Sequence, residues 1–132
     1  MSVVEPEPQV RVLVVDDQEP FRRAARAVVA AAPGFTLVGE ASSGELAVEL
    51  AAALHPDLVL LDVRMPGIGG AEAARRIAAP LVVLISTHPA PVVIDAAPLR
   101  FLPKEDFGPS ALRALWHGRA SAADRTSTAA PP

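Results

Sequence analysis

The chain has 132 residues, which suits one domain with short tails, and 51% of them are hydrophobic, enough for a buried core. A formal net charge of −3 argues against a nucleic-acid-binding module with a basic stripe, and the lack of cysteine excludes disulfides and thiolate metal sites. Because the acidic, proline-containing start is unlike a signal peptide and no apolar run reaches the roughly 18 residues of a membrane span, we expect a soluble, cytoplasmic protein.

Short apolar runs predict five β-strands along the chain. The runs lie at residues 10–15, 36–41, 57–61, 81–85 and 99–102. The first, third and fourth lack polar alternation, which is typical of parallel strands covered on both faces.

Helical patterns separate or follow these runs. A first helix begins near Pro20 and ends before Pro33, and one face of it carries Phe21, Ala24, Ala25, Val28 and Val29. A second is capped within Ser42–Ser43, and its inward face is expected to carry Leu46, Leu50, Ala53 and Leu54. A third covers residues 71–79, and a last one begins at Pro109 and ends at Gly118. This alternation predicts a doubly wound α/β sheet with right-handed crossovers.

Polar residues follow several of the predicted strands, at the edge where such sheets bind ligands. Asp16 and Asp17 follow the first strand, Asp62 the third, Ser86 the fourth and Lys104 the fifth. Carboxylates without histidine or cysteine favour a hard cation such as Mg²⁺. An aspartate can itself be the nucleophile in phosphoryl transfer, with lysine and hydroxyl groups on the phosphoryl oxygens. The edge therefore predicts magnesium-assisted formation of an aspartyl phosphate.

The ordered pieces VLVVDD, LLDVRMPG, VVLIS and FLPK resemble the receiver domain of two-component response regulators over residues 10–118. The resemblance implies a flavodoxin-like, five-stranded parallel sheet of strand order 2-1-3-4-5. It implies that Asp62 is the phosphoacceptor, that Asp17 binds Mg²⁺ directly with help from Asp16, and that the backbone carbonyl of Arg64 completes the metal site.

The resemblance also assigns residues to the switch and to the rates. Ser86 would be the switch hydroxyl, with Thr87 as the neighbouring alternative, and Lys104 would contact a phosphoryl oxygen. Phe101 would occupy the aromatic switch position. Three further side chains would surround the phosphoryl group and tune its lifetime, unless they simply point to solvent: Gln18, Arg64 and His88.

One segment departs from the family pattern. From Ser86 to Lys104 there are 104 − 86 = 18 positions, about one helical turn fewer than in most receivers. Pro89, Pro91 and Pro98 also disfavour a long helix there. The helix before the fifth strand is therefore expected to be short, displaced or missing, which would alter the usual output face.

We expect residues 1–9 to be a flexible N-terminal segment, 10–118 the receiver domain and 119–132 a disordered tail. The chain is therefore expected to be a stand-alone receiver, unless a DNA-binding domain has been truncated. Its expected partners are a sensor histidine kinase or phosphotransfer protein and a downstream protein, without nucleic acid or membrane, and a homodimer is left open. The domain would be regulatory, catalysing only its own phosphorylation and dephosphorylation.

Two other functions compete with this one. The first is a phosphorylation-independent interaction module on a receiver fold, which the proline-rich segment keeps open. The second is an aspartate-nucleophile hydrolase, which is disfavoured because Arg64 stands where such enzymes usually place an acid.

Overall fold

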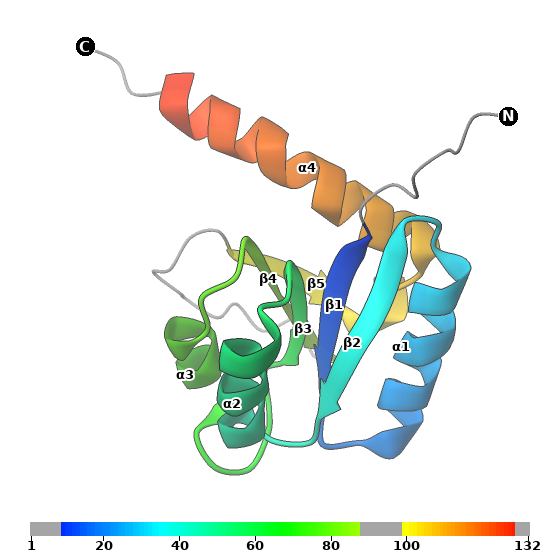
Figure 1. Ribbon diagram of the computed structural model, residues 1–132, viewed down its shortest axis with the longest axis vertical. Helices are drawn as coiled ribbons and strands as arrows, with labels where there is room; N and C mark the ends of the chain where they lie inside the picture. The colour runs from blue at the N-terminus through cyan, green and yellow to red at the C-terminus, as the bar shows by residue number, and fades with distance from the viewer. Residues whose placement is uncertain (1–8, 88–98, 129–132) are drawn as a thin grey trace, which may run out of the picture.

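A five-stranded parallel sheet forms the centre of the molecule (Figure 1). The computed structural model describes residues 9–87 and 99–128. The strand order β2-β1-β3-β4-β5 is the order that the family resemblance implied. The strands agree with the predicted runs to within one residue at each end: β1 (Val10–Val15), β2 (Phe35–Ala41), β3 (Leu58–Asp62), β4 (Leu81–Ser86) and β5 (Leu99–Pro103).

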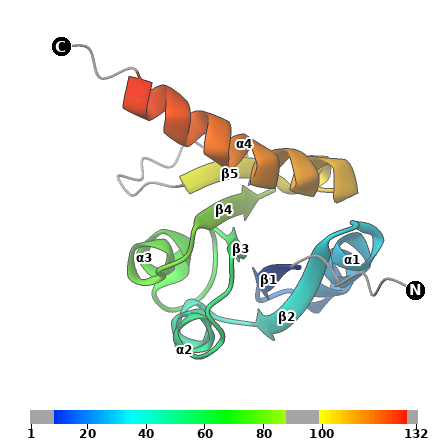
Figure 2. The same ribbon diagram turned by 45° about the horizontal axis from the view of Figure 1, so that its top comes forward.

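Helices cover both faces of the sheet. They are α1 (Glu19–Ala31), α2 (Gly44–Leu54), α3 (Gly69–Arg76), the short 3-10 helix η1 (Lys104–Asp106) and α4 (Pro109–Thr128). Figure 2 shows α1 and α4 on one side of the sheet and α2 and α3 on the other. The molecule is thus a three-layer α/β/α structure, as the alternation of strands and helices predicts.

Two apolar layers hold the helices to the sheet. In β1, Val12 and Val14 pack toward α1 and α4, whereas Leu13 and Val15 pack toward α2 and α3. Successive side chains of a strand point to opposite faces, so a strand that is covered on both sides must be apolar throughout. This is why the central runs of the sequence carry no polar alternation.

The predicted inward face of α2 is only partly correct: Leu50 packs on the core and Leu54 is half-buried, but Leu46 and Ala53 are not on this face. The buried positions of this helix are Gly44, Ala47 and Ala51, whereas Leu46 is 37% exposed and Ala53 is exposed. Small residues let the helix approach the sheet closely, and the larger leucines are left at the side of the contact. Ser43 caps the helix as expected, because its side chain accepts a hydrogen bond from the Leu46 N–H at 3.1 Å.

Two helix ends also differ from the sequence prediction. Helix α3 ends at Arg76, and Ile77 takes an extended conformation that buries its side chain to 7% exposure. The prediction that Gly118 ends the last helix is wrong, because α4 continues to Thr128. A glycine inside a helix costs only about 1 kcal/mol, and the arginine, alanine and serine residues after it permit helix. The division of the chain into receiver and tail at residue 118 stays a prediction.

The crossover from β4 to β5 contains the proline-rich segment. Within the described part of the chain no helix lies between these two strands. The prediction of a short, displaced or missing helix falls on residues 88–98, which lie outside the described residues, as does His88. Over 9–87 and 99–128, none of the helices combines the length and apolar character that crossing a membrane requires.

Candidate functional site

The turn after β1 presents the acidic pair. The backbone N–H of Asp16 donates to the carbonyl of Ala41 in β2 at 3.0 Å, and the Gln18 N–H donates to Asp16 Oδ1 at 2.8 Å. Asp16 is fully buried, whereas Asp17, the next residue, is exposed. The two adjacent carboxylates thus differ in environment: Asp16 is fixed inside the fold, and Asp17 is accessible to solvent.

Asp62 is the last residue of β3 and lies at the same edge of the sheet. It is 6% exposed, and its Oδ1 accepts a hydrogen bond from the Arg64 N–H at 3.3 Å. Gly70 lets α3 start directly against this strand end, since a Cβ on Gly70 would lie 2.2 Å from the Asp62 carbonyl oxygen. The carboxylate is therefore fixed at the end of a strand rather than carried on a loop.

Lys104 brings a cation into this group of carboxylates. Its ammonium lies 2.6 Å from Oδ2 of Asp16 and 3.7 Å from Oδ2 of Asp62. The ammonium also lies 4.6 Å from the centre of the Phe21 ring, a cation–π distance, and Phe21 packs on Phe107 with ring centres 6.0 Å apart. Asp16 after β1, Asp62 at the end of β3 and Phe21 in α1 thus hold the largely buried Lys104 side chain in place.

The carboxylates outnumber the cation, and the pKa of Asp62 reflects this. Burial of the carboxyl group and the nearby charge of Asp16 raise the pKa of Asp62 to about 6, although Lys104 acts in the opposite direction. With all three aspartates ionised, the single ammonium leaves an excess of two negative charges.

A divalent metal ion fits this excess charge. Asp16, Asp17 and Asp62 each offer a carboxylate oxygen, and these oxygens lie within 4.8 Å of one another. All are hard oxygen ligands, and the exposed Asp17 leaves one side open for water and for a phosphoryl oxygen. The donor set therefore suits Mg²⁺.

The structure separates the two candidate hydroxyl residues. In the sheet register, Asp62 pairs with Ile85, and Ser86 pairs with Pro103, the residue before Lys104. Ser86 lies between the ends of β3 and β5 and is 4% exposed, whereas Thr87 is exposed. This placement favours Ser86 over Thr87 as the hydroxyl of the site.

The other predicted residues contact the site only through their backbone or lie on the edge strand. Arg64 and Gln18 are exposed and reach the site through their N–H groups, which bind Asp62 and Asp16. Phe101 is 40% exposed on β5, the edge strand, where it pairs with Leu84. The metal role of the Arg64 carbonyl and the switch role of Phe101 stay predictions.

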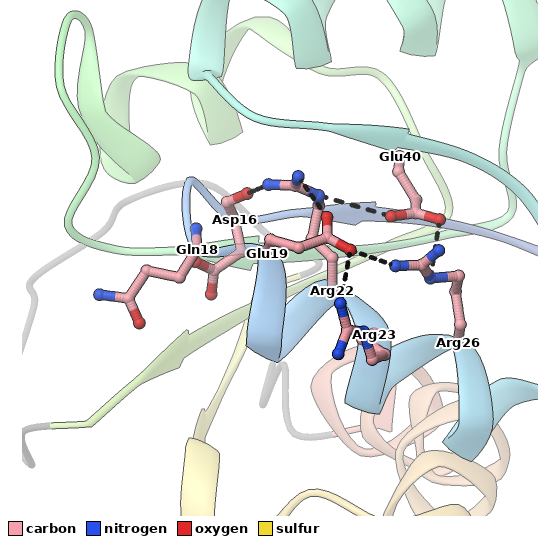
Figure 3. Close-up of polar contacts among 7 residues, drawn as sticks. All are labelled: Asp16, Gln18, Glu19, Arg22, Arg23, Arg26 and Glu40. Atoms are coloured by element: carbon pink, nitrogen blue, oxygen red, sulfur yellow. Dashed lines mark hydrogen bonds and ion pairs between the residues drawn. The ribbon is translucent and has the colours of Figure 1, made fainter.

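Two contributors were not recognised in the sequence. The apolar pattern predicts Phe21 on the inward face of the first helix but not its contact with Lys104, and it predicts no role for Arg22. Arg22 Nη1 in fact donates to the backbone carbonyl of Asp16 at 2.7 Å, and its side chain is only 18% exposed (Figure 3). Their position, one helical turn after the acidic pair, was the available signal.

Comparisons with known proteins agree with this geometry. A family model described as the response regulator receiver domain matches residues 12–104. Response regulator GacA of Pseudomonas viridiflava is 45% identical over 80 residues, which cover 61% of this chain and 34% of that protein. The nitrate/nitrite response regulator NarL of Escherichia coli K12 is 48% identical over 61 residues, covering 46% of this chain and 28% of that protein. The chain spans about a third or less of the length of these curated relatives.

Solved structures give the same result over a larger share of the chain. The signal receiver domain of NarL from Mycobacterium tuberculosis aligns with a TM-score of 0.74 and 32% identity, covering 86% of this chain and 98% of that one. The response regulator domain of Thermotoga maritima CheB aligns with a TM-score of 0.61 and 26% identity, covering 94% and 99%. The chain therefore belongs to the family of response regulator receiver domains, which act in two-component signalling.

Proposed function

We propose that this domain accepts a phosphoryl group on Asp62 with the help of Mg²⁺ and thereby switches the binding of a protein partner. The observation that carries the proposal is the position of the Lys104 ammonium between the buried carboxylates of Asp16 and Asp62, with Asp17 in the same group. A largely buried lysine among carboxylates at the ligand-binding edge of a doubly wound sheet suits phosphoryl transfer better than a purely structural role.

The transfer step needs a carboxylate nucleophile and charge neutralisation. An oxygen of Asp62 forms the new bond to phosphorus while the bond from phosphorus to the donor's histidine nitrogen breaks, and that nitrogen keeps the electron pair. Asp16, Asp17, Asp62 and the Arg64 carbonyl would hold Mg²⁺, which supplies positive charge to the phosphoryl oxygens. Because the pKa of Asp62 is about 6, its nucleophilic form dominates above that pH.

Ser86 and Lys104 would bind the phosphoryl oxygens of the product. Lys104 already lies close to Asp62, at 3.7 Å, so it can contact the new group by leaving Asp16. Phe101 would repack during this change, since it is half-exposed on β5, the edge strand that follows the crossover from β4. Gln18, Arg64 and His88 would set how long the phosphoryl group survives.

The donor would be a sensor histidine kinase or a phosphotransfer protein, because the chain belongs to a family that acts in two-component signalling. In this proposal the domain is a regulatory phosphoacceptor in the cytoplasm and turns over no other substrate. Its output is contact with a downstream protein, through a shift between two pre-existing conformations.

The test is intact-protein mass spectrometry after incubation with acetyl phosphate, a small acyl phosphate donor, and Mg²⁺. The wild-type chain should gain one phosphoryl group, and the gain should disappear with a chelator or in Asp62→Asn. Asp106→Asn is the matched control, since this exposed aspartate lies outside the group of carboxylates. No gain in the wild-type chain, or an equal gain in Asp62→Asn, would contradict the proposal.

A further inference from the structure

The side chain of Arg22 connects the metal-binding turn to a ring of charges on α1 and β2. Each of its three guanidinium nitrogens has a partner (Figure 3). Nη1 donates to the Asp16 carbonyl at 2.7 Å, Nη2 to Glu19 Oε2 at 2.7 Å, and Nε lies 3.4 Å from Glu40 Oε1. A planar guanidinium with three partners in three directions has little freedom to turn.

The ring closes through a second arginine. Arg26 Nη2 lies 2.7 Å from Glu19 Oε1, and its Nε lies 3.3 Å from Glu40 Oε2. Two cations and two anions therefore alternate around the ring, and its formal charge is zero. A network of this kind orders its members better than an isolated surface ion pair does. Arg22 differs from Arg26 in one respect: it also binds the backbone of the acidic turn.

The carbonyl that Arg22 binds belongs to the peptide group joining Asp16 to Asp17. The N–H of Asp16 is held by Ala41 in β2 at 3.0 Å, and the Gln18 N–H binds the Asp16 side chain at 2.8 Å. Asp17 itself is exposed. The orientation of its backbone, and with it the direction of its carboxylate, depends on the plane of the peptide group that Arg22 holds.

We propose that Arg22 is a positioning residue for the metal site: it fixes the Asp16–Asp17 peptide group so that the Asp17 carboxylate points toward the oxygens of Asp16 and Asp62, and Glu19 and Glu40 hold Arg22 in turn. The inference rests on the proposed function only for the identity of the metal as Mg²⁺. Groups that orient metal ligands without touching the metal typically change metal affinity by about 10- to 100-fold when they are removed.

An electrostatic role and a positioning role of Arg22 predict opposite changes in the Kd for Mg²⁺ when Arg22 is replaced by methionine. Removing a cation near a metal site strengthens the attraction for Mg²⁺, so a purely electrostatic role would lower the Kd. Loss of the peptide-group contact frees the Asp17 backbone, so a positioning role raises the Kd, by about 10-fold or more. Arg26→Met is the matched control, because it removes a cation from the same ring and leaves the Asp16 carbonyl bound.

The experiment measures the Kd for Mg²⁺ by isothermal titration calorimetry in the wild-type chain, Arg22→Met, Arg22→Lys and Arg26→Met. We expect the largest increase for Arg22→Met, a smaller one for Arg22→Lys, which keeps one donor, and little change for Arg26→Met. Melting temperatures without Mg²⁺ show whether each variant is folded, and Arg22→Lys carries the test if Arg22→Met unfolds.

A second measurement separates positioning from a part in the transfer itself. The rate of phosphorylation by acetyl phosphate is followed against Mg²⁺ concentration. Arg22→Met should need more Mg²⁺ and reach the wild-type rate at saturation. An unchanged or lower Kd, or a rate that stays low at saturating Mg²⁺, would overturn the role of Arg22. If the wild-type chain binds no Mg²⁺, the proposed function fails instead, so the two failures are distinguishable.

Discussion

The ammonium of Lys104 lies 2.6 Å from Oδ2 of Asp16, closer than to Oδ2 of Asp62 at 3.7 Å. The lysine is therefore paired first with a carboxylate of the metal site and only second with the proposed phosphoacceptor. Asp16 is fully buried, so this ion pair is protected from water and from screening by salt. The site without metal uses Lys104 as its own counter-ion.

Replacing Lys104 should destabilise the metal-free domain. Lys104→Met would leave two buried carboxylates without their cation, so we expect the free energy of unfolding to fall by about 3 kcal/mol. Urea denaturation in the presence of a chelator measures this loss, and Mg²⁺ should restore part of it. The control is Arg113→Met, an exposed cation on α4. Equal effects of the two substitutions would contradict the role of the buried pair.

Lys104 also offers a specific spectroscopic probe, since it is the single lysine of the chain. A protein with isotope-labelled lysine gives one backbone amide signal in NMR, and that signal should shift on addition of Mg²⁺ and again on phosphorylation. The shift caused by phosphorylation should be absent when Asp62→Asn is treated with acetyl phosphate. A signal that does not respond to phosphorylation of the wild-type chain would show that Lys104 does not take part in the switch.

Removing the charge of Asp62 should stabilise the metal-free domain at neutral pH. The pKa of Asp62 is raised from 3.8 to about 6, so between these values the folded state binds more protons than the unfolded state. The contribution of this group to stability is therefore fully present below about pH 4 and is lost as the pH rises through about 6, by up to about 3 kcal/mol. Asp62→Asn should raise the free energy of unfolding at neutral pH and have little effect at about pH 4. Stabilisation of the same size at both pH values would point to a cause other than this carboxylate.

The affinity for Mg²⁺ should depend on pH through the same group. Below a pH of about 6 the proton competes with the metal for Asp62, so the Kd should rise by up to about 10-fold for each pH unit. Above that pH the affinity should level off, because the carboxylate is already ionised. Calorimetric titrations at several pH values measure the curve. An affinity that is constant from about pH 5 to neutral pH would exclude Asp62 as a ligand.

Gly70 should be indispensable for the end of β3. A Cβ at this position would lie 2.2 Å from the Asp62 carbonyl oxygen and 2.8 Å from the Val63 Cα, both backbone atoms. Gly70→Ala should therefore push α3 away from the strand, destabilise the domain by about 2 kcal/mol or more, and weaken binding of Mg²⁺. Thermal unfolding and calorimetry measure the two effects. Wild-type values for both would show that the contact relaxes at no cost.

Gly118 should behave in the opposite way. It lies inside α4, and a Cβ added there meets no atom within 4 Å. Gly118→Ala should raise the free energy of unfolding by up to about 1 kcal/mol and increase helical content, because alanine is the better helix former. Circular dichroism with thermal melting tests this. Destabilisation would mean that the helix ends at this glycine, as the sequence alone suggested.

The strands and the edge of the site were predictable from the sequence for a simple reason. Continuous apolar runs are required wherever a strand is covered on both faces, and the carboxyl ends of parallel strands lie on one edge. Asp16 and Asp62 therefore had to come close together once the runs before them were recognised as neighbouring strands. The motifs and their order then led to the receiver family.

Helix faces and helix ends were less predictable, because they depend on what packs beside them. In α2 the sequence favoured leucines for the inward face, yet the small residues Ala47 and Ala51 are buried and Leu46 is exposed. Glycine is a residue type typical of helix ends, and Gly118 nevertheless lies within α4. Local preference sets a bias of about 1 kcal/mol or less per residue, which packing readily exceeds.

The sequence by itself determined the sheet, its order of strands and helices, and the residue types gathered at its edge. Only the tertiary structure decided that Lys104 pairs with Asp16 before Asp62, and that Arg22 binds the carbonyl of the acidic turn. The physical reason is that periodicity encodes which residues are buried, whereas hydrogen bonds and ion pairs depend on distances of a few ångströms between segments far apart in the chain. Those distances are fixed only when α1 and the segment after β5 have docked on the sheet.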